Sequence, residues 1–148
     1  MKKQILKCSL ILLIGISFVG CSVLKNNKKI ENKPLIGTVW NVVKINKTEI
    51  PAIGSSPYIL FSETGNYNGS TGCNKFFGTF ILNKKTISME NSGATKKMCA
   101  NMEIERQFLG AIKREINYYT IQVDTLVLYE KTTEVLRFVA SKNPVNQE

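Results

Sequence analysis

The sequence predicts a single α+β domain in which an antiparallel sheet is curved, or closed into a cracked barrel of about eight short strands, with one amphipathic helix. Turn-forming residues recur about every eight to twelve positions from Leu35 onward, with β-branched and aromatic runs between them. One later stretch instead repeats apolar residues at helical spacing. A chain of 148 residues fits one core, and we expect the folded domain to span residues 35–142.

The expected strands are short apolar runs that end at turn residues. Their ranges are 37–45, 58–62, 67–70, 76–82, 86–89, 118–123, 126–129 and 135–140. The segments 63–66, 83–85, 124–125 and 131–134 are the expected hairpin turns. In the last three strands apolar residues alternate, as at Leu126 and Leu128, which predicts one buried and one solvated face.

Residues 101–117 break this pattern and predict the helix. The apolar stripe consists of Phe108, Leu109, Ile112 and Ile116. Asn101 is the expected N-cap, and Glu103 and Glu105 lie in the first turn, where the helix dipole favours acids. A stripe of this width predicts a helix that packs on the sheet.

The N-terminal segment 1–20 predicts a cleaved secretory signal. Three lysines precede an apolar run at residues 9–20. This run of 12 residues is short for a membrane span, which needs about 20. We therefore expect export rather than a retained anchor helix.

The end of this signal, Phe18-Val19-Gly20-Cys21, resembles the lipobox of bacterial lipoproteins. The resemblance implies that Cys21 is lipidated and becomes the mature N-terminus. Ser22 follows, not the Asp that often retains lipoproteins at the inner membrane. We expect a lipid-anchored protein of the cell envelope, at the outer membrane if the cell has one and otherwise on the outer face of the cytoplasmic membrane.

Residues 21–34 read as a flexible lysine-rich tether, and residues 143–148 as a flexible tail. The chain carries a net charge of +9, of which about +3 lies in the signal and about +3 in the tether. The remaining basicity is modest. The lysine pairs at 84–85 and 96–97, with aromatic residues at 118–119, could form a basic nucleic-acid patch. Export argues against that partner, so we expect the membrane as a partner and no nucleic acid.

The chain contains no histidine, which excludes Ser-His-Asp and Cys-His catalytic pairs and histidine-containing zinc sites. The acidic residues of the domain lie in separate turns or at the helix start, with no pairing visible in the sequence. They include Glu63, Glu90, Glu103, Glu105 and Asp124. We expect no enzyme, no metal and no cofactor.

Two cysteines, Cys73 and Cys99, remain in the exported domain, where disulfides can form. They either form a bridge that closes a loop of about 27 residues or stay as two buried thiols. The sequence leaves both alternatives open. Their spacing does not fit a CxxC redox motif.

The segment 69–78, followed by 94–101 and the helix, resembles the META-domain family, the group that includes the HslJ-type bacterial envelope lipoproteins. The resemblance rests on Gly69, Gly72, Cys73, Asn74, Gly78, Thr95, Met98 and Cys99. The strand with Trp40 and the closing hairpin with Leu136 and Phe138 also fit, so the likeness covers roughly residues 35–140.

The resemblance implies a small β-rich domain with one helix, no established catalytic residues, and a role in envelope integrity or stress tolerance. The three glycines read as bends or close approaches, and Asn74 as a partner for turn backbone groups. An alternative is that Cys73, Asn74, Thr95 and Cys99 line a pocket. Other functions left open are a lipocalin-like or pilot-like module that holds a lipid or peptide, and an exported enzyme inhibitor. An envelope protein or a lipid is therefore a possible ligand.

Overall fold

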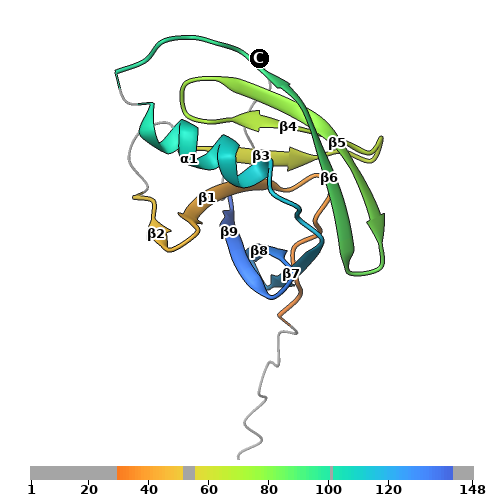
Figure 1. Ribbon diagram of the computed structural model, residues 1–148. Helices are drawn as coiled ribbons and strands as arrows, with labels where there is room; N and C mark the ends of the chain where they lie inside the picture. The colour runs from red at the N-terminus through yellow and green to blue at the C-terminus, as the bar shows by residue number, and fades with distance from the viewer. Residues whose placement is uncertain (1–29, 52–55, 101, 142–148) are drawn as a thin grey trace, which may run out of the picture.

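The computed structural model describes residues 30–51, 56–100 and 102–141, which fold into nine strands and one helix (Figure 1). The elements are β1 (Val39–Ile45), β2 (Thr48–Glu49), β3 (Tyr58–Phe61), β4 (Asn66–Ser70), β5 (Lys75–Asn83), β6 (Thr86–Ala94), α1 (Glu103–Ile112), β7 (Tyr118–Gln122), β8 (Thr125–Glu130) and β9 (Thr133–Ala140). Each of the eight expected strands is present, and the predicted β-rich fold with one helix is confirmed.

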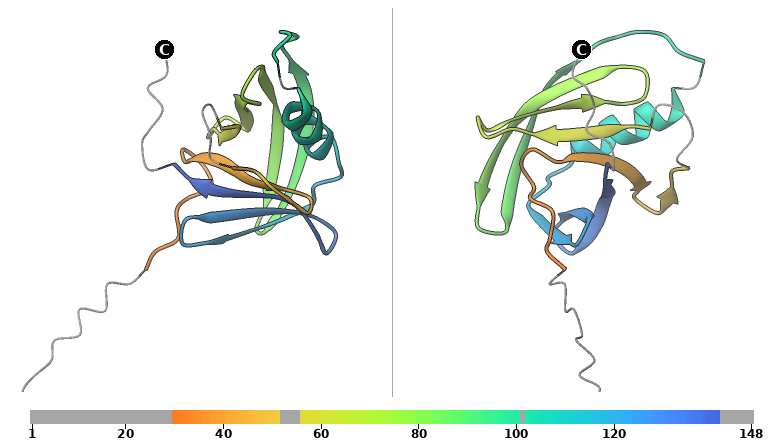
Figure 2. Two further views of the ribbon diagram at one scale, coloured as in Figure 1. Left: turned by 90° about the vertical axis from the view of Figure 1, so that its left-hand side faces the viewer. Right: turned by 180° about the vertical axis from the view of Figure 1, so that it is seen from behind.

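Eight of these strands form a closed antiparallel ring, the barrel. The strand order is β2-β1-β3-β4-β5-β6-β7-β8-β9, and β1 also pairs with β9 to close it. The short β2 lies outside the ring as a hairpin partner of β1. The joint between β6 and β7 is the weakest, because Thr86 and Tyr118 are its single register pair. The barrel is therefore cracked: most of one edge of β6 has no strand partner. Figure 2 shows the barrel from two further sides.

The ends of β6 and α1 differ most from the sequence-based expectation. Strand β6 continues to Ala94 rather than stopping at Met89, because its second half pairs with β5 across a bulge. Helix α1 stops at Ile112 rather than at residue 117. Asn117 instead donates its N–H to Tyr129 and accepts a hydrogen bond from Ile87, so sheet pairing ends the helix.

Several expectations fall on segments outside the described residues. These are the signal 1–20, the lipidation site Cys21, the tether up to residue 29 and the tail 143–148. The expected N-cap, Asn101, also lies outside them, and the N-cap position of α1 belongs to Met102, which makes no side-chain capping hydrogen bond. The last part of the expected tether is described, and it is held against the barrel. Lys33 donates its N–H to the carbonyl of Val123, and Asn32 Oδ1 accepts from the N–H of Val123, each at 2.7 Å.

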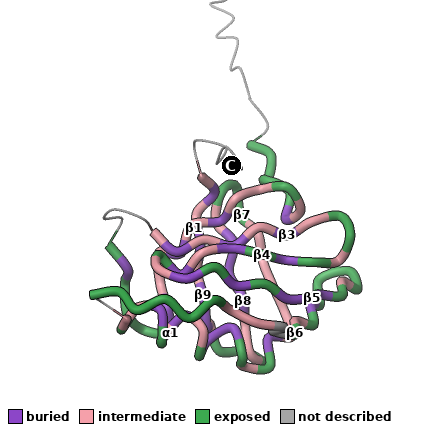
Figure 3. Tube along the Cα trace, turned by 90° about the horizontal axis from the view of Figure 1, so that it is seen from above, coloured by how far each residue is buried: buried purple, intermediate pink, exposed green. Residues whose placement is uncertain are grey.

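Buried and exposed residues alternate along β4 and β5 (Figure 3). Large buried side chains fill the barrel interior. Aromatic rings form a continuous chain of contacts through it. The chain runs from Phe80 through Phe61, Tyr67, Phe76 and Phe108 to Phe138, with centroid separations between 5.0 and 6.4 Å. Trp40 is fully buried in the same core and donates its indole N–H to Leu35. The core therefore extends from β3 to β9 through the helix.

Helix α1 packs on the barrel through Phe108, which contacts Phe76 of β5 and Phe138 of β9. Ile112 and Ile116 are also buried, whereas Leu109 is half-buried. The predicted apolar stripe is thus the contact face of the helix. Among the described residues, none of the helical segments has the length and apolar character needed to span a bilayer.

Candidate functional site

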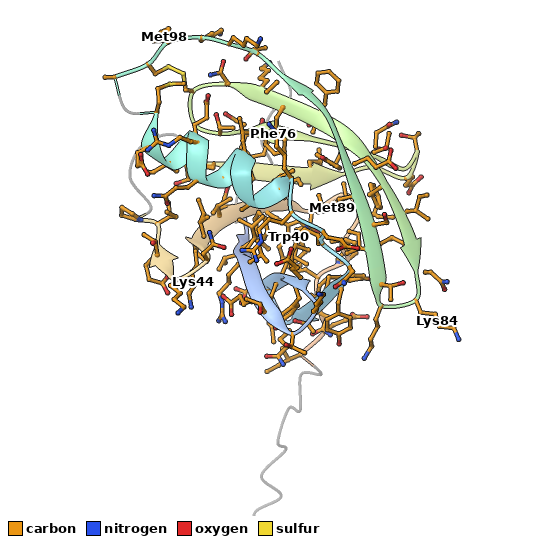
Figure 4. All side chains as sticks on the ribbon, viewed as in Figure 1. Trp40, Lys44, Phe76, Lys84, Met89 and Met98 are labelled. Atoms are coloured by element: carbon orange, nitrogen blue, oxygen red, sulfur yellow. A yellow bond between two sulfur atoms is a disulfide. The ribbon has the colours of Figure 1, made fainter. Side chains whose placement is uncertain are left out.

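Three segments that are far apart in the sequence meet at one end of the barrel. They are the turn between β4 and β5 (residues 71–74), the segment that follows β6 (residues 95–99) and the first turn of α1. Figure 4 shows a sulfur–sulfur bond beside the loop that carries Met98, at this end. We call this region the motif site, because it contains most of the residues on which the family resemblance rests.

Asn74 is the hub of the motif site. Its side chain is fully buried, and its Oδ1 accepts hydrogen bonds from the Thr95 hydroxyl and the Lys97 N–H, both at 2.7 Å. Its Nδ2 donates to the Lys97 carbonyl at 3.0 Å and to the Glu105 carboxylate at 2.8 and 2.9 Å. One amide side chain therefore joins the turn, the segment after β6 and the helix.

Glu105 supplies a buried carboxylate at the base of the helix and is only 7% exposed. It accepts hydrogen bonds from the Asn74 side chain, from the Asn74 backbone N–H at 3.2 Å and from the Thr71 hydroxyl. Within the described residues no lysine or arginine pairs with it. Hydrogen-bond donors and the N-terminal end of the helix dipole balance its charge instead.

Cys73 and Cys99 form a disulfide in the structure, with their Cα atoms 6.2 Å apart. This separation lies in the usual range for a bridge. Of the two alternatives that the sequence left open, the structure therefore contains the bridge. It joins the β4–β5 turn to the segment just before α1, and Asn74 connects the same two segments by hydrogen bonds.

Two glycines of the family motif are required by close packing. A Cβ at Gly69 would lie 2.0 Å from the Tyr58 carbonyl oxygen, and a Cβ at Gly78 would lie 2.2 Å from that of Glu90. Real Cβ atoms do not approach so closely, so larger residues would push strands apart. Gly72 has a φ of +95°, a conformation that favours glycine in the turn.

The remaining motif residues differ in their placement. Thr95 is exposed, but its hydroxyl donates to Asn74 and accepts from the Lys75 N–H at 3.1 Å. Met98 is 91% exposed and makes no core contact. The lysine pairs at 84–85 and 96–97 lie at opposite ends of β6, as Lys84 and Met98 show in Figure 4. The structure therefore does not assemble them into one basic patch.

The pKa values of Tyr67, Glu130 and Glu134 are shifted, and these residues lie outside the motif site. Burial raises the pKa of Tyr67 to about 12, while its hydroxyl donates to the Glu90 carbonyl at 3.1 Å. Hydrogen bonding to Arg114 lowers the pKa of Glu130, and hydrogen bonding to Arg137 lowers that of Glu134. These shifts reflect packing and surface ion pairs.

Sequence reasoning missed two members of the motif site, Thr71 and Glu105. Glu105 looked like an ordinary acid in the first helical turn, equivalent to Glu103. Its position three residues before Phe108, on the face of the apolar stripe, is the signal that could have identified it. Thr71 gave no comparable signal, because it lies in a turn.

The polar atoms of the motif site bind one another rather than a vacant centre. The Asn74 amide, the Thr71 and Thr95 hydroxyls and the Glu105 carboxylate all have partners within the domain. No three His, Cys, Asp or Glu side chains of the described ranges gather as metal ligands would. Chemically, the arrangement clamps three segments together.

The fold and this clamp define a class of protein: a small closed antiparallel β-barrel whose single helix is fixed to one end by a disulfide and a buried polar network. The META domain family profile matches residues 33–143, and the chain belongs to this family. Comparison with curated protein sequences finds no match.

Solved structures share the fold. One is the NMR structure of a protein from Burkholderia xenovorans, which is 24% identical with a TM-score of 0.60, over 74% of this chain and 85% of that one. Another is the crystal structure of a DUF4847 family protein from Bacteroides vulgatus, at 16% identity and a TM-score of 0.54, over 74% and 96%. A further NMR structure is 20% identical with a TM-score of 0.55, over 69% and 87%. At these identities the likeness concerns the fold alone.

Proposed function

We propose that this protein is a lipid-anchored, non-enzymatic META-domain protein of the cell envelope, where it supports envelope integrity or stress tolerance. The anchor is the lipidated Cys21, and residues 22–31 link it to the barrel. The envelope role is carried over from the family resemblance. The folded domain acts through binding rather than chemistry.

One observation supports a non-enzymatic role most directly: the polar groups of the motif site already form hydrogen bonds within the domain. Asn74 uses both ends of its amide, and Glu105 accepts from three donors. A catalytic carboxylate needs access to a substrate proton. Glu105 is buried and faces donors of its own domain instead.

The filled interior argues against a lipocalin-like or pilot-like carrier that holds its ligand inside the barrel. Fully buried aromatic side chains, among them Trp40, Phe76 and Phe138, occupy this space. Two hollows in the described structure lie outside that core. One, of about 510 Å³, borders α1 and the end of β6, and the other, of about 440 Å³, borders the N-terminal segment and β7. We therefore place binding on the outer surface.

The anchor is tested by replacing Cys21. In cells fed a labelled fatty acid, Cys21→Ala is expected to abolish incorporation of label into this protein, because the acyl-accepting thiol is lost. The protein is then expected to leave the membrane fraction or to accumulate as uncleaved precursor. Cys8→Ala is the matched control, because it removes a thiol from the same leader and is expected to retain label. Unchanged membrane partitioning of Cys21→Ala would refute the anchor.

The envelope role is tested separately in a deletion strain challenged with detergent or a cell-wall antibiotic. Wild-type protein is expected to restore growth, whereas Cys21→Ala is not. A deletion strain that grows like its parent under every such challenge would contradict the envelope role while leaving the anchor intact.

A further inference from the structure

The seam of the barrel leaves one edge of β6 without a strand partner. Beyond the Thr86–Tyr118 pair, the single backbone hydrogen bond from Ile87 to Asn117 is the last one across the seam in the described structure. From Ser88 to Ala94, β6 is paired only with β5. Unpaired strand edges are templates for the addition of another strand.

The hydrogen-bond alternation identifies which backbone groups face this edge. Ile87 N–H points across the seam, so the alternation of an antiparallel strand points that of Ser88 to β5 and that of Met89 back to the seam. At the other end, the Thr95 N–H bonds to the Lys75 carbonyl, so the backbone of Ala94 faces outward. The free edge therefore offers main-chain donors and acceptors at both of its ends.

A groove of about 510 Å³ runs between the end of β6 and α1. Gly93, Ala94 and the segment 95–98 form one wall, and Met102 and Leu109 are on the other. Methionine side chains adapt to varied apolar partners. This groove lies next to the outward-facing end of the β6 edge.

The rim of the groove is basic. Lys96, Lys97 and Lys113 line it, and all three are exposed. Across the described ranges none of them has an acidic partner within ion-pair distance. The one acid that lines the groove, Glu105, is already occupied by Thr71 and Asn74. The groove therefore lacks charge compensation and favours an anionic occupant.

We propose that the β6 edge and this groove bind an extended acidic segment of another envelope protein by strand addition. Its backbone pairs with β6 near Ala94, alternate apolar side chains enter the groove toward Leu109, and its carboxylates meet the three lysines. The end of β6, which borders the groove, lies at the top of Figure 1, and the described N-terminal segment lies at the bottom. A partner can thus approach without crossing residues 31–34.

The surface favours a peptide over an acyl chain. A lipid tail would fill apolar space but would leave the outward N–H and C=O groups of the β6 edge without partners. An extended polypeptide satisfies these groups and places side chains on alternate faces. The envelope location of the partner rests on the proposed function, whereas the seam, the groove and the lysines belong to the folded domain and do not depend on the lipid anchor.

The test uses the full chain in phosphatidylcholine nanodiscs and a fluorescent peptide of alternating Glu and Val, six residues long. We expect saturable binding by fluorescence anisotropy, weaker at high salt. The triple variant Lys96→Glu, Lys97→Glu, Lys113→Glu is expected to weaken binding by about tenfold or more. The matched control is Lys47→Glu, Lys84→Glu, Lys85→Glu, at three exposed lysines that do not line the groove. It changes the net charge equally and is expected to change affinity by less than about twofold.

A separate experiment tests whether the peptide pairs with β6 through its backbone. A peptide N-methylated at alternate residues keeps its charge but loses the N–H groups of one edge, and we expect it not to bind. Ala94→Pro removes an outward N–H of β6 and is expected to weaken binding in the same way. Melting temperatures of all variants, compared with wild type, separate lost binding from lost folding.

Three outcomes would overturn the proposal. Equal loss of affinity in both triple variants would show a general charge effect. Undiminished binding of the N-methylated peptide would exclude backbone pairing. Absence of peptide binding, together with capture of phosphatidylglycerol vesicles that depends on Lys96, Lys97 and Lys113, would assign the groove to a lipid surface instead.

Discussion

A single buried carboxylate organises the end of the barrel that carries the helix. Glu105 receives the Asn74 amide, the Asn74 backbone N–H and the Thr71 hydroxyl. Because these donors are also buried, each would lose its partner if the carboxylate were removed. Glu103, two residues earlier on the same helical turn, is exposed and pairs with Arg106 at the surface.

Glu105→Ala is expected to lower the free energy of unfolding by about 2–4 kcal/mol, because it leaves buried donors without acceptors. Guanidinium unfolding, followed by the fluorescence of the only tryptophan, Trp40, measures this loss. Glu103→Ala is the matched control and is expected to cost about 0.5 kcal/mol. Equal costs for the two variants would show that the Glu105 network does not stabilise the fold.

At the scale of elements, the disulfide and the polar network act on the same pair of segments. Cys73 and Cys99 lie 26 residues apart in sequence and enclose β5 and β6. The bridge restricts the unfolded chain, whereas the Asn74 hydrogen bonds act only in the folded state. The two links therefore contribute to stability by different routes.

The double variant Cys73→Ser, Cys99→Ser is expected to lose about 3 kcal/mol of unfolding free energy, as the loop length implies. It is still expected to fold, because Asn74 and the core remain. Reduction by dithiothreitol is expected to shift the unfolding midpoint of the wild type to that of the variant and to leave the variant unchanged. A wild-type midpoint that does not respond to complete reduction would contradict a stabilising bridge.

At the scale of the whole molecule, stability should vary around the ring. Strand β8 is paired on both sides, with Leu128 opposite Tyr119 and Leu136. The second half of β6 is paired on one side only. The seam is therefore the place where the barrel opens most easily.

Amide hydrogen exchange tests this view. The Leu128 amide is expected to exchange about a hundredfold or more slowly than the outward-facing amides of Met89 and Ala94. The same amides of β6 are expected to become protected when the acidic peptide binds. Equal protection of Met89 and Leu128 in the free protein would mean that the seam is closed by contacts other than the pairing described.

Much of the fold could be predicted, because local patterns report burial. The stripe through Phe108 correctly gave the contact face of the helix. The alternation predicted along the last strands holds only in part, because Val127 is buried between Leu126 and Leu128 and β7 is half-buried on both faces. The same patterns predicted the ends of the strands and the helix less accurately. Strand β6 continues through Gly93 because β5 pairs with it. Helix α1 ends before the predicted residue because Asn117 forms backbone hydrogen bonds with the sheet. Both differences follow from tertiary pairing that overrides local propensity.

The motif site was predicted as a set of residues but not as a mechanism of assembly. Asn74 was expected to satisfy backbone groups of its own turn, whereas its side chain bonds the backbone of Lys97, in the segment after β6. Its partner Glu105 could not be separated from Glu103 by residue type. Only packing of the helix against the β4–β5 turn buries one acid and exposes the other.

By itself, the sequence determined that this chain forms a β-rich domain with one helix and belongs among META domains, since turn spacing and apolar periodicity are local properties. The tertiary structure alone decided where the ring is weakest, which carboxylate is buried and where a basic groove lies beside a free strand edge. Those features depend on which distant segments meet when the barrel closes. The free energy of strand pairing and packing belongs to contacts between segments, so the sequence of a single segment does not predict these features.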